Sequence, residues 1–348
     1  MQTDGKGVFM ALKRVTMQDI ADACGLSRNT VSKIFNGRGA VPEATKKQVL
    51  AKAQELGYHQ RPAEAAGESG ENIALLTQHK LLSHNFGAYF ITSFTDQICR
   101  SGYTMKIYEI SPAELAEKRL PPHLDLEQTA GLLGIELFDR AYLDMICSLG
   151  KPTVFVDGFA RASMAPIGCD YVSMENLASE SALVKQMIKG GARRIGFVGD
   201  AEHCNSFYER WLGFCLALGE AGLTVERELC ILDPDSDLYG DAAWLQKKLD
   251  AMPSTPDAFA CANDYLAIHL MTALKKKGLS VPGDVMLAGF DGSLEAAVVD
   301  PPLATAQIPS VEIGRLAAAL LSERIRFPDS PFRWTYVKTT PVWGGTIR

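Results

Sequence analysis

From Ile73 onward, short apolar runs alternate with stretches of amphipathic helical periodicity, and this alternation limits the fold of the chain more than any other feature. The amphipathic stretches include residues 89–100, 177–189, 208–221 and 265–277. Strands that alternate with helices favour parallel, doubly wound sheets. Since eight strands are expected, we predict two α/β lobes rather than one. The expected strands are 73–76, 104–108, 131–135, 153–156, 195–198, 230–232, 258–261 and 285–288.

The composition is that of an ordinary globular protein, with 47% hydrophobic and 22% charged residues in a chain of 348. No apolar stretch approaches the roughly 20 residues of a membrane helix, and the N-terminus lacks the apolar run of a secretory signal. The eight cysteines include no CxxC pair and the six histidines are dispersed, so no metal site or disulfide framework is expected. These features predict a cytoplasmic protein without membrane, metal or cofactor partners.

The net charge of −6 is distributed unevenly along the chain. Residues 1–61 contain ten Lys or Arg against five Asp or Glu, a balance of +5, which leaves −11 for the rest. A small basic segment on a large acidic one predicts a polyanionic partner for the basic segment. A solvated helical surface is the alternative, and charge alone leaves both open.

The basic segment has the pattern of three short helices. Apolar residues at the i, i+3, i+4, i+7 spacing predict a first helix that starts at Met17 and stops at Gly25. Ser27 is placed to cap a second helix over 28–35, and Pro42 suits the start of a third. Helix, glycine turn and helix is the architecture that places a second helix in the major groove of DNA.

Polar side chains occupy the face of the second helix that is expected to point outward. The long donors Arg28, Asn29 and Lys33 have the reach to contact base edges. Shorter polar groups suit phosphate oxygens. The spacing favours DNA binding, and the alternative is a three-helix structural domain with a polar solvent face. The candidates for phosphate contacts are Thr16, Ser27, Thr30, Ser32, Asn36 and Thr45.

The run from Val15 to Gly37 resembles the N-terminal DNA-binding domain of the lactose-repressor (LacI/GalR) family, and the similarity continues to Tyr58. The family consists of dimeric bacterial transcription regulators. The resemblance therefore implies a helix-turn-helix domain over residues 15–58, here called the head, and base-reading roles for the three long donors. Lys33 stands where family members more often have arginine, and lysine lacks the planar fork that pairs bidentately with guanine.

Residues 59–72 form the linker that follows the head. In relatives this segment forms a hinge helix that inserts a leucine into the minor groove. Here Gly67 falls at about the leucine position, and Glu64, Glu68 and Glu71 would repel phosphates. The composition favours a flexible tether over a hinge helix that orders on DNA, and both interpretations remain open.

Polar residues directly after strands are candidates for a ligand site, because ligands of doubly wound folds bind beyond the carboxyl ends of the strands. Asp157, Asn263 and Asp291 each follow an apolar strand, and Arg210 lies early in an expected helix. Carboxylates accept hydroxyl protons, and arginine donates a fork of hydrogen bonds to ligand oxygens. For each acidic or amide residue the alternative is a helix cap or a turn.

Residues 73–343, here called the body, contain four segments that resemble the effector domain of the LacI/GalR family, which is itself similar to periplasmic sugar-binding proteins. By position, the resemblance implies effector contacts from Arg210, Asn263 and Asp291, from Asp157 on the other lobe, and from Tyr239, near an aromatic that stacks on the ligand. The matching segments are 192–199, 209–214, 256–264 and 281–291.

The family topology implies three crossings between the lobes. Lobe 1 is expected to take about 72–170 and 307–333, and lobe 2 about 171–306 and 334–343. Gly292 replaces a second aspartate that is common in relatives, so the identity of the ligand stays open. The chain ends without leucine heptads, which favours a homodimer over a tetramer.

The sequence thus predicts a small all-α helix-turn-helix head followed by an α/β body of two doubly wound, periplasmic-binding-protein-like lobes. It predicts an effector-responsive transcriptional regulator, a repressor that binds double-stranded operator DNA as a homodimer under the control of a small polar ligand such as a sugar. The alternative is a cytosolic solute-binding protein with a vestigial DNA-binding head. An enzyme is not expected, because the sequence contains no Walker loop, HExxH or GxSxG motif.

Overall fold

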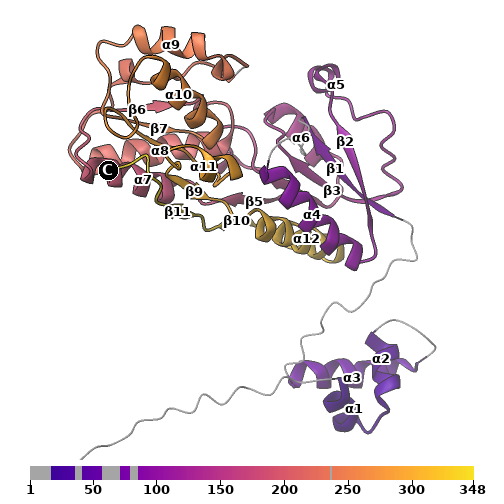
Figure 1. Ribbon diagram of the computed structural model, residues 1–348. Coiled ribbons are helices and arrows are strands. Elements are labelled where there is room, and N and C mark those ends of the chain that lie inside the picture. Colours follow the sequence, from indigo (N-terminus) through magenta and orange to yellow (C-terminus); the bar gives the residue numbers. More distant parts are fainter. Residues whose placement is uncertain (1–16, 36–40, 57–70, 79–84, 236) are drawn as a thin grey trace, which may run out of the picture. The chain divides into compact units, whose positions relative to one another are not determined.

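The computed structural model divides the chain into two units, residues 1–68 and 69–348, which are described separately (Figure 1). The predicted contacts at Thr16 and Asn36, residues 57–58 at the end of the head and residues 59–70 of the linker lie outside the described residues. The described residues are 17–35, 41–56, 71–78, 85–235 and 237–348.

Three helices form the head: α1 (Met17–Cys24), α2 (Arg28–Phe35) and α3 (Glu43–Glu55). These helices confirm the prediction to within about one residue at each end. Gly25 ends α1 at a φ of +65°, a left-handed conformation that glycine adopts without strain. The helices pack around a small apolar core made of Ile20, Ala21, Val31, Ile34, Val49 and Ala53.

The first lobe is built on a six-stranded parallel sheet in the order β10-β5-β4-β3-β1-β2. The β4 strand is buried along its whole length, as expected for a parallel sheet covered on both faces. Four of the six strands match predicted ones, whereas β5 and β10 do not. The strands are β1 (Asn72–Thr77), β2 (Thr104–Glu109), β3 (Thr129–Ile135), β4 (Thr153–Val156), β5 (Asp170–Met174) and β10 (Trp334–Val337).

Helices cover both faces of this sheet because successive side chains of each strand point to opposite sides. Ile73 and Leu75 of β1 join the core under α4 (Asn85–Arg100) and α12 (Ser310–Arg326). Ala74 and Leu76 join a separate core with α6 (Arg140–Ser148). The short helix α5 (Pro112–Glu117) follows β2.

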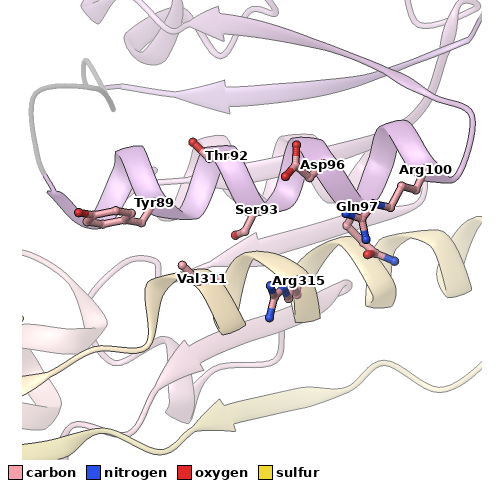
Figure 2. Close-up of a pocket in the computed structure, with 8 residues that line it drawn as sticks. All are labelled: Tyr89, Thr92, Ser93, Asp96, Gln97, Arg100, Val311 and Arg315. Carbon is pink, nitrogen blue, oxygen red and sulfur yellow. The ribbon is translucent and has the colours of Figure 1, made fainter.

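The helices α4 and α12 lie side by side (Figure 1). Gly314 of α12 permits this close approach, because a Cβ atom there would lie 2.1 Å from Ser93 Oγ and 2.6 Å from the Phe90 carbonyl oxygen. Figure 2 shows Ser93 on the side of α4 that faces α12. A groove of about 300 Å³ runs along this pair, with Asp96 and Arg315 among its polar lining.

The second lobe contains a three-stranded parallel sheet in the order β6-β7-β8. The predicted strand 230–232 is reduced to one parallel bridge between Ile231 and Val198. Two helices lie on either side of the sheet, α7 and α8 on one side and α9 and α10 on the other (Figure 1). The elements are β6 (Ile195–Val198), β7 (Ala258–Cys261), β8 (Met286–Ala288), α7 (Leu177–Lys189), α8 (Asn205–Glu220), α9 (Ala242–Asp250), α10 (Asp264–Lys276) and α11 (Leu294–Val298).

Three crossings connect the lobes: from β5 to α7, from β9 (Thr305–Gln307) to α12, and from β10 to β11 (Thr340–Val342). The number of crossings is the one that the resemblance implied. The boundaries differ, because β5 pairs with β4 and β10 pairs with β5, which keeps both strands in the first lobe. Lobe 1 therefore extends to Met174 and to Val337, a few residues further than residues 170 and 333.

Within the described part of the chain, no helix has the length and apolar character that crossing a membrane requires.

Candidate functional site

The exposed face of α2 carries long hydrogen-bond donors. Arg28 and Asn29 lie in its first turn and Lys33 in its last, and all three are exposed. None of the three side chains has a hydrogen bond or ion pair to another described residue. Their donors are therefore available to a partner molecule, as the sequence predicts for residues that contact DNA.

Two lysines of α3 form ion pairs with glutamates of the same helix. Lys46 pairs with Glu43 at 3.3 Å, and Lys52 pairs with Glu55 at 2.9 Å. Surface pairs of this kind contribute little stability, but they satisfy the lysine charges within the helix. Lys47, which is exposed on α3, has no hydrogen bond or ion pair to another described residue, so α3 also offers one unpaired donor beside those of α2.

The shorter polar residues of the head have mixed roles. Ser27 caps α2, since its Oγ accepts a hydrogen bond from the Thr30 amide at 3.1 Å and lies 2.8 Å from Thr30 Oγ1. Ser27 and Thr30 sit at the N-terminus of a helix, where the macrodipole favours phosphate. Thr45 is half-buried on α3, and Ser32 lies on α2. Their phosphate contacts stay predictions.

In the body, Asp157 connects the lobes at the carboxyl end of β4. Ser206, at the start of α8 in the second lobe, donates from Oγ to Asp157 Oδ2 at 2.6 Å and from its amide to Oδ1 at 3.2 Å. The amide of Gly158 also donates to Oδ1, at 2.9 Å. Asp157 is therefore held by neutral donors from both lobes, with a φ of +54°.

Arg210 and Asp291 meet in the second lobe. Arg210 is buried on α8, and its Nη1 lies 3.1 Å from Asp291 Oδ1 and 2.6 Å from the Ala262 carbonyl oxygen. Its Nε donates to Asn176 Oδ1 at 3.0 Å, and its guanidinium lies 3.8 Å from the centre of the Phe290 ring. These contacts fix the guanidinium beside Asp291, whose side chain is 33% exposed.

The sequence analysis missed Glu136, which follows β3 at the same edge of the first-lobe sheet as Asp157. Burial, and to a smaller extent the charges of Asp157 and Asp291, together raise the pKa of its carboxyl to about 7. Glu136 and Asp157 follow the neighbouring strands β3 and β4 of the first lobe, whereas Asp291 follows β8 of the second lobe, so the carboxylates that influence Glu136 come from both lobes. The signal was an acidic residue directly after a buried strand, the criterion that selected Asp157.

Aromatic rings of the two lobes also meet. Phe138, two residues after Glu136, packs edge to face on His203 of the second lobe, with ring centres 4.7 Å apart. His203 Nδ1 lies 3.2 Å from Asp235, and its ring is 5.3 Å from that of Phe207 on α8. Such rings offer apolar faces on which the carbon skeleton of a sugar can lie.

A buried hydrogen-bond network joins helix α8, which carries Arg210, to the segments that cross between the lobes. Glu209 on α8 accepts hydrogen bonds from Asn176 Nδ2 at 2.9 Å, Asn205 Nδ2 at 2.9 Å and the Tyr336 hydroxyl at 2.7 Å. Asn176 follows β5 and Tyr336 lies on β10, so both crossing segments are tied to the helix that carries Arg210. Arg210 is thereby linked through α8 to the segments between the lobes.

The two other predicted effector residues, Asn263 and Tyr239, make contacts within the second lobe that do not by themselves indicate a ligand. Asn263 caps α10, where its Oδ1 accepts from the Leu266 amide at 2.9 Å, so the capping alternative holds and a ligand role stays a prediction. Tyr239, in the turn η4 (Asp237–Gly240), is 1% exposed, and its hydroxyl donates to the carbonyls of Ile231 and Asp233. The ring is buried in the second-lobe core, so this geometry gives no support to the prediction that it stacks on a ligand.

Comparison with known proteins supports both parts of this description. Residues 16–61 match the bacterial regulatory proteins of the lacI family, and residues 184–347 match the periplasmic binding protein-like domain. The HTH-type transcriptional regulator MalR of Streptomyces coelicolor is 30% identical over 329 residues, spanning 90% of this chain and 91% of MalR.

Two solved structures have the same fold. The complex of the transcriptional regulator CelR with cellobiose gives a TM-score of 0.69 at 24% identity, covering 96% of this chain and 100% of CelR. The lac repressor dimer bound to operator and the anti-inducer ONPF gives 0.67 at 20% identity, covering 96% of this chain and 99% of that one.

A helix-turn-helix head with free donors on its second helix, joined to a two-lobed binding-protein body, defines a DNA-binding transcriptional regulator. The identity with MalR extends over nine-tenths of both chains. The chain belongs to the LacI family of bacterial regulatory proteins.

Proposed function

We propose that this protein is an effector-responsive repressor that binds a roughly palindromic operator as a homodimer in the cytoplasm. The observation that carries the proposal is the exposed face of α2, where Arg28, Asn29 and Lys33 lack partners among the described residues. A dimer with two such helices reads two half-sites, which explains why an operator of this kind is symmetric. No catalytic role is proposed.

The ligand of the body is proposed to be a small hydroxyl-rich molecule of the sugar type, bound between the lobes. Asp157 of the first lobe and the Arg210–Asp291 pair of the second supply acceptors and donors from both lobes. A ligand that touches both sides stabilises one arrangement of the lobes over the other. Coupling of this kind between two sites is typically worth about 1–3 kcal/mol and acts in both directions.

The linker is proposed to act as a tether. Its glycines disfavour a helix, its glutamates disfavour contact with phosphates, and it has no large apolar side chain at the position of the wedge. The effector would then act chiefly through the spacing of the two heads. The head is proposed to span 15–58 and the body 73–343.

Lys33→Ala tests this proposal on operator sequences selected from random DNA with the full-length protein. Loss of a base contact is expected to weaken specific binding by about 1–3 kcal/mol and to relax the preference at one position of each half-site. The matched control is Lys52→Ala, because Lys52 is paired with Glu55 on α3. Its binding should equal that of the wild type.

Two results contradict the proposal in different ways. If Lys33→Ala keeps the affinity and the base preference of the wild type, α2 is not the recognition helix. If the wild type selects no DNA sequence but binds sugars, the solute-binding alternative with a vestigial head is correct.

A further inference from the structure

Glu209 on α8 is a buried carboxylate, 8% exposed, whose hydrogen-bond donors come from separate segments of the body. Asn205 donates from the start of the same helix. Asn176 donates from the segment that crosses between the lobes after β5, and Tyr336 donates from β10. Burial of a carboxylate is costly unless donors of this kind satisfy it, so Glu209 favours the arrangement in which all of these segments reach it.

The hydrogen bond from Tyr336 to Glu209 joins the two lobes. Strand β10 pairs with β5 in the first-lobe sheet, whereas α8 packs against α7 in the second lobe. The Tyr336 hydroxyl lies 2.7 Å from Glu209 Oε1. Burial, followed by this hydrogen bond, raises the pKa of the hydroxyl, which therefore keeps its proton and remains a donor. Because the two atoms belong to different lobes, a rotation of one lobe against the other changes the distance between them.

Asn176 connects the same carboxylate to Arg210. Its Nδ2 donates to Glu209 Oε2 and to the Met174 carbonyl oxygen, each at 2.9 Å. Its Oδ1 accepts from Arg210 Nε at 3.0 Å. Both hydrogens and the oxygen of this buried amide are therefore in use, which fixes its orientation. A shift of the Arg210 guanidinium displaces an amide that cannot turn over without losing hydrogen bonds to Glu209 and Met174.

We propose that Glu209 is a positioning residue that couples Arg210 to the arrangement of the lobes, and that the hydrogen bond from Tyr336 is the contact that lobe movement breaks. One carboxylate oxygen holds Asn176, and through it Arg210, while the other holds the first lobe through Tyr336. The importance of this coupling for operator binding rests on the proposed function, in which a ligand acts through the lobes. The alternative is a static cross-link that only adds stability.

Backbone amides whose hydrogen bonds cross from one lobe to the other report on lobe separation. The Asn205 amide donates to the Gly158 carbonyl oxygen at 2.8 Å. The Ser206 amide donates to Asp157 Oδ1 at 3.2 Å. In the opposite direction, the Ser163 amide of the first lobe donates to Asn205 Oδ1 at 3.2 Å. The amides of Asn205, Ser206 and Ser163, here called the interlobe amides, exchange with solvent when the lobes separate.

Tyr336→Phe is the main variant, studied in the full-length protein without any sugar by hydrogen exchange and mass spectrometry. It removes only the hydroxyl that donates to Glu209, so exchange of the interlobe amides is expected to rise by about three- to tenfold, the effect of losing one hydrogen bond. Glu209→Gln replaces one acceptor oxygen by a donor and should raise this exchange at least as much. The Leu132 amide, which bonds to the Pro152 carbonyl oxygen within the first lobe, should keep the wild-type rate.

Tyr142→Phe is the matched control, because it removes the same group from a buried hydrogen bond of similar length. The Tyr142 hydroxyl donates to the Arg119 carbonyl oxygen at 2.9 Å, and both residues belong to the first lobe. This variant should leave exchange of the interlobe amides at the wild-type rate, although it lowers the stability of the first lobe.

Arg210→Lys tests the link between Arg210 and the lobes. Lysine keeps a positive charge near Asp291 but lacks the Nε donor to Asn176. If one network carries both contacts, Tyr336→Phe should raise the exchange of the interlobe amides by less than about twofold in the Arg210→Lys background, because contacts within one network are not additive. An equal rise in both backgrounds would show that Arg210 and the lobe contact are independent.

The proposal is overturned by that equal rise, or if Tyr336→Phe or Glu209→Gln leaves the interlobe amides at the wild-type rate. It is also overturned if Tyr142→Phe raises their exchange as much, or if the Leu132 amide accelerates by the same factor, since the hydrogen bond would then be a static cross-link. Failure of the proposed function is read separately: a wild type that selects no DNA sequence would reject the regulator and leave the exchange result intact.

Discussion

Glu180 is a carboxyl group buried in the second lobe on α7, against the backbone of α8 at Gly213. Neither of its side-chain oxygens has a hydrogen-bond partner among the described residues. Burial raises its pKa from 4.5 to about 8, and the charge of Arg210 offsets only part of this effect. The folded protein therefore keeps Glu180 protonated at neutral pH, whereas the unfolded chain ionises it.

Glu180→Gln should remove a pH dependence of stability. Because the folded pKa lies above the unfolded value, the native state binds more protons between pH 4.5 and about 8, and stability falls as pH rises through this window. One such group contributes a slope of up to about 1.4 kcal/mol per pH unit. Urea unfolding of the variant at pH 5 and pH 8 should show a smaller difference than the wild type.

Glu220→Gln is the control for this measurement. Glu220 lies on the exposed end of α8 beside Lys185, with both side chains about half exposed, so its replacement should leave the pH profile unchanged. Equal slopes in the wild type and in Glu180→Gln would show that Glu180 is ionised in the fold.

At the residue scale, the sequence selected Asp157, Asn263 and Asp291, each of which follows an apolar strand, and Arg210 by family resemblance, but it passed over Glu136, which follows a strand in the same way. Arg210 and Asp291 do meet, as expected for two residues of one site. Glu136 escaped prediction because its significance depends on acidic neighbours from another strand and another lobe. The ligand role of Tyr239 stays a prediction that the geometry does not support, because its hydroxyl donates to backbone acceptors in the core, which no local pattern reveals.

At the element scale, one side chain caps the start of α2, the helix that we propose reads the operator. Ser27→Ala removes the side-chain acceptor of the Thr30 amide, which keeps only the Ser27 carbonyl oxygen at 2.9 Å, and should destabilise the helix start by about 1 kcal/mol. We expect faster amide hydrogen exchange at Thr30 and Val31 and weaker operator binding. Ser27→Asn, which keeps a cap, should restore protection of these amides from exchange. Exchange in Ser27→Ala that equals the wild type would show that the cap contributes nothing.

The strands show which elements a sequence pattern can define. Strands such as Thr153–Val156 are uninterrupted apolar runs and were predicted at their observed bounds. By contrast, β5 and β10 mix polar and apolar residues and are strands because they pair with each other, although more than 150 residues separate them in the sequence. The segment 230–232 has the apolar character of a strand but makes only one bridge. Pairing with a neighbouring strand, rather than the local sequence, therefore determines whether these segments are strands.

At the scale of the whole body, the first lobe is assembled from segments far apart in the chain. A buried ion pair joins them: Arg324 Nε on α12 lies 2.7 Å from Asp170 Oδ2 at the start of β5, with side chains 3% and 0% exposed. Asp170 also accepts from the Arg333 amide at 2.8 Å, just before β10. The Arg324 guanidinium donates further to the carbonyls of Pro328, Ser330 and Pro331. One carboxylate thus fixes three segments.

Asp170→Ala should therefore destabilise the body strongly. Removal of one partner leaves Arg324 buried and unpaired, which typically costs about 3–5 kcal/mol. The control is Glu323→Ala, which breaks the exposed pair with Arg333 and should cost less than about 1 kcal/mol. Urea unfolding can be followed by tryptophan fluorescence, since Trp334 on β10 stacks on Tyr171 at 4.1 Å and reports on this sheet.

The double variant Asp170→Ala with Arg324→Met separates the loss of a pair from the loss of packing. Because it removes the uncompensated charge as well, it should recover part of the stability that Asp170→Ala loses. If Asp170→Ala costs no more than Glu323→Ala, the ion pair does not hold the discontinuous segments together, and the apolar contacts between α12 and the sheet must do so alone.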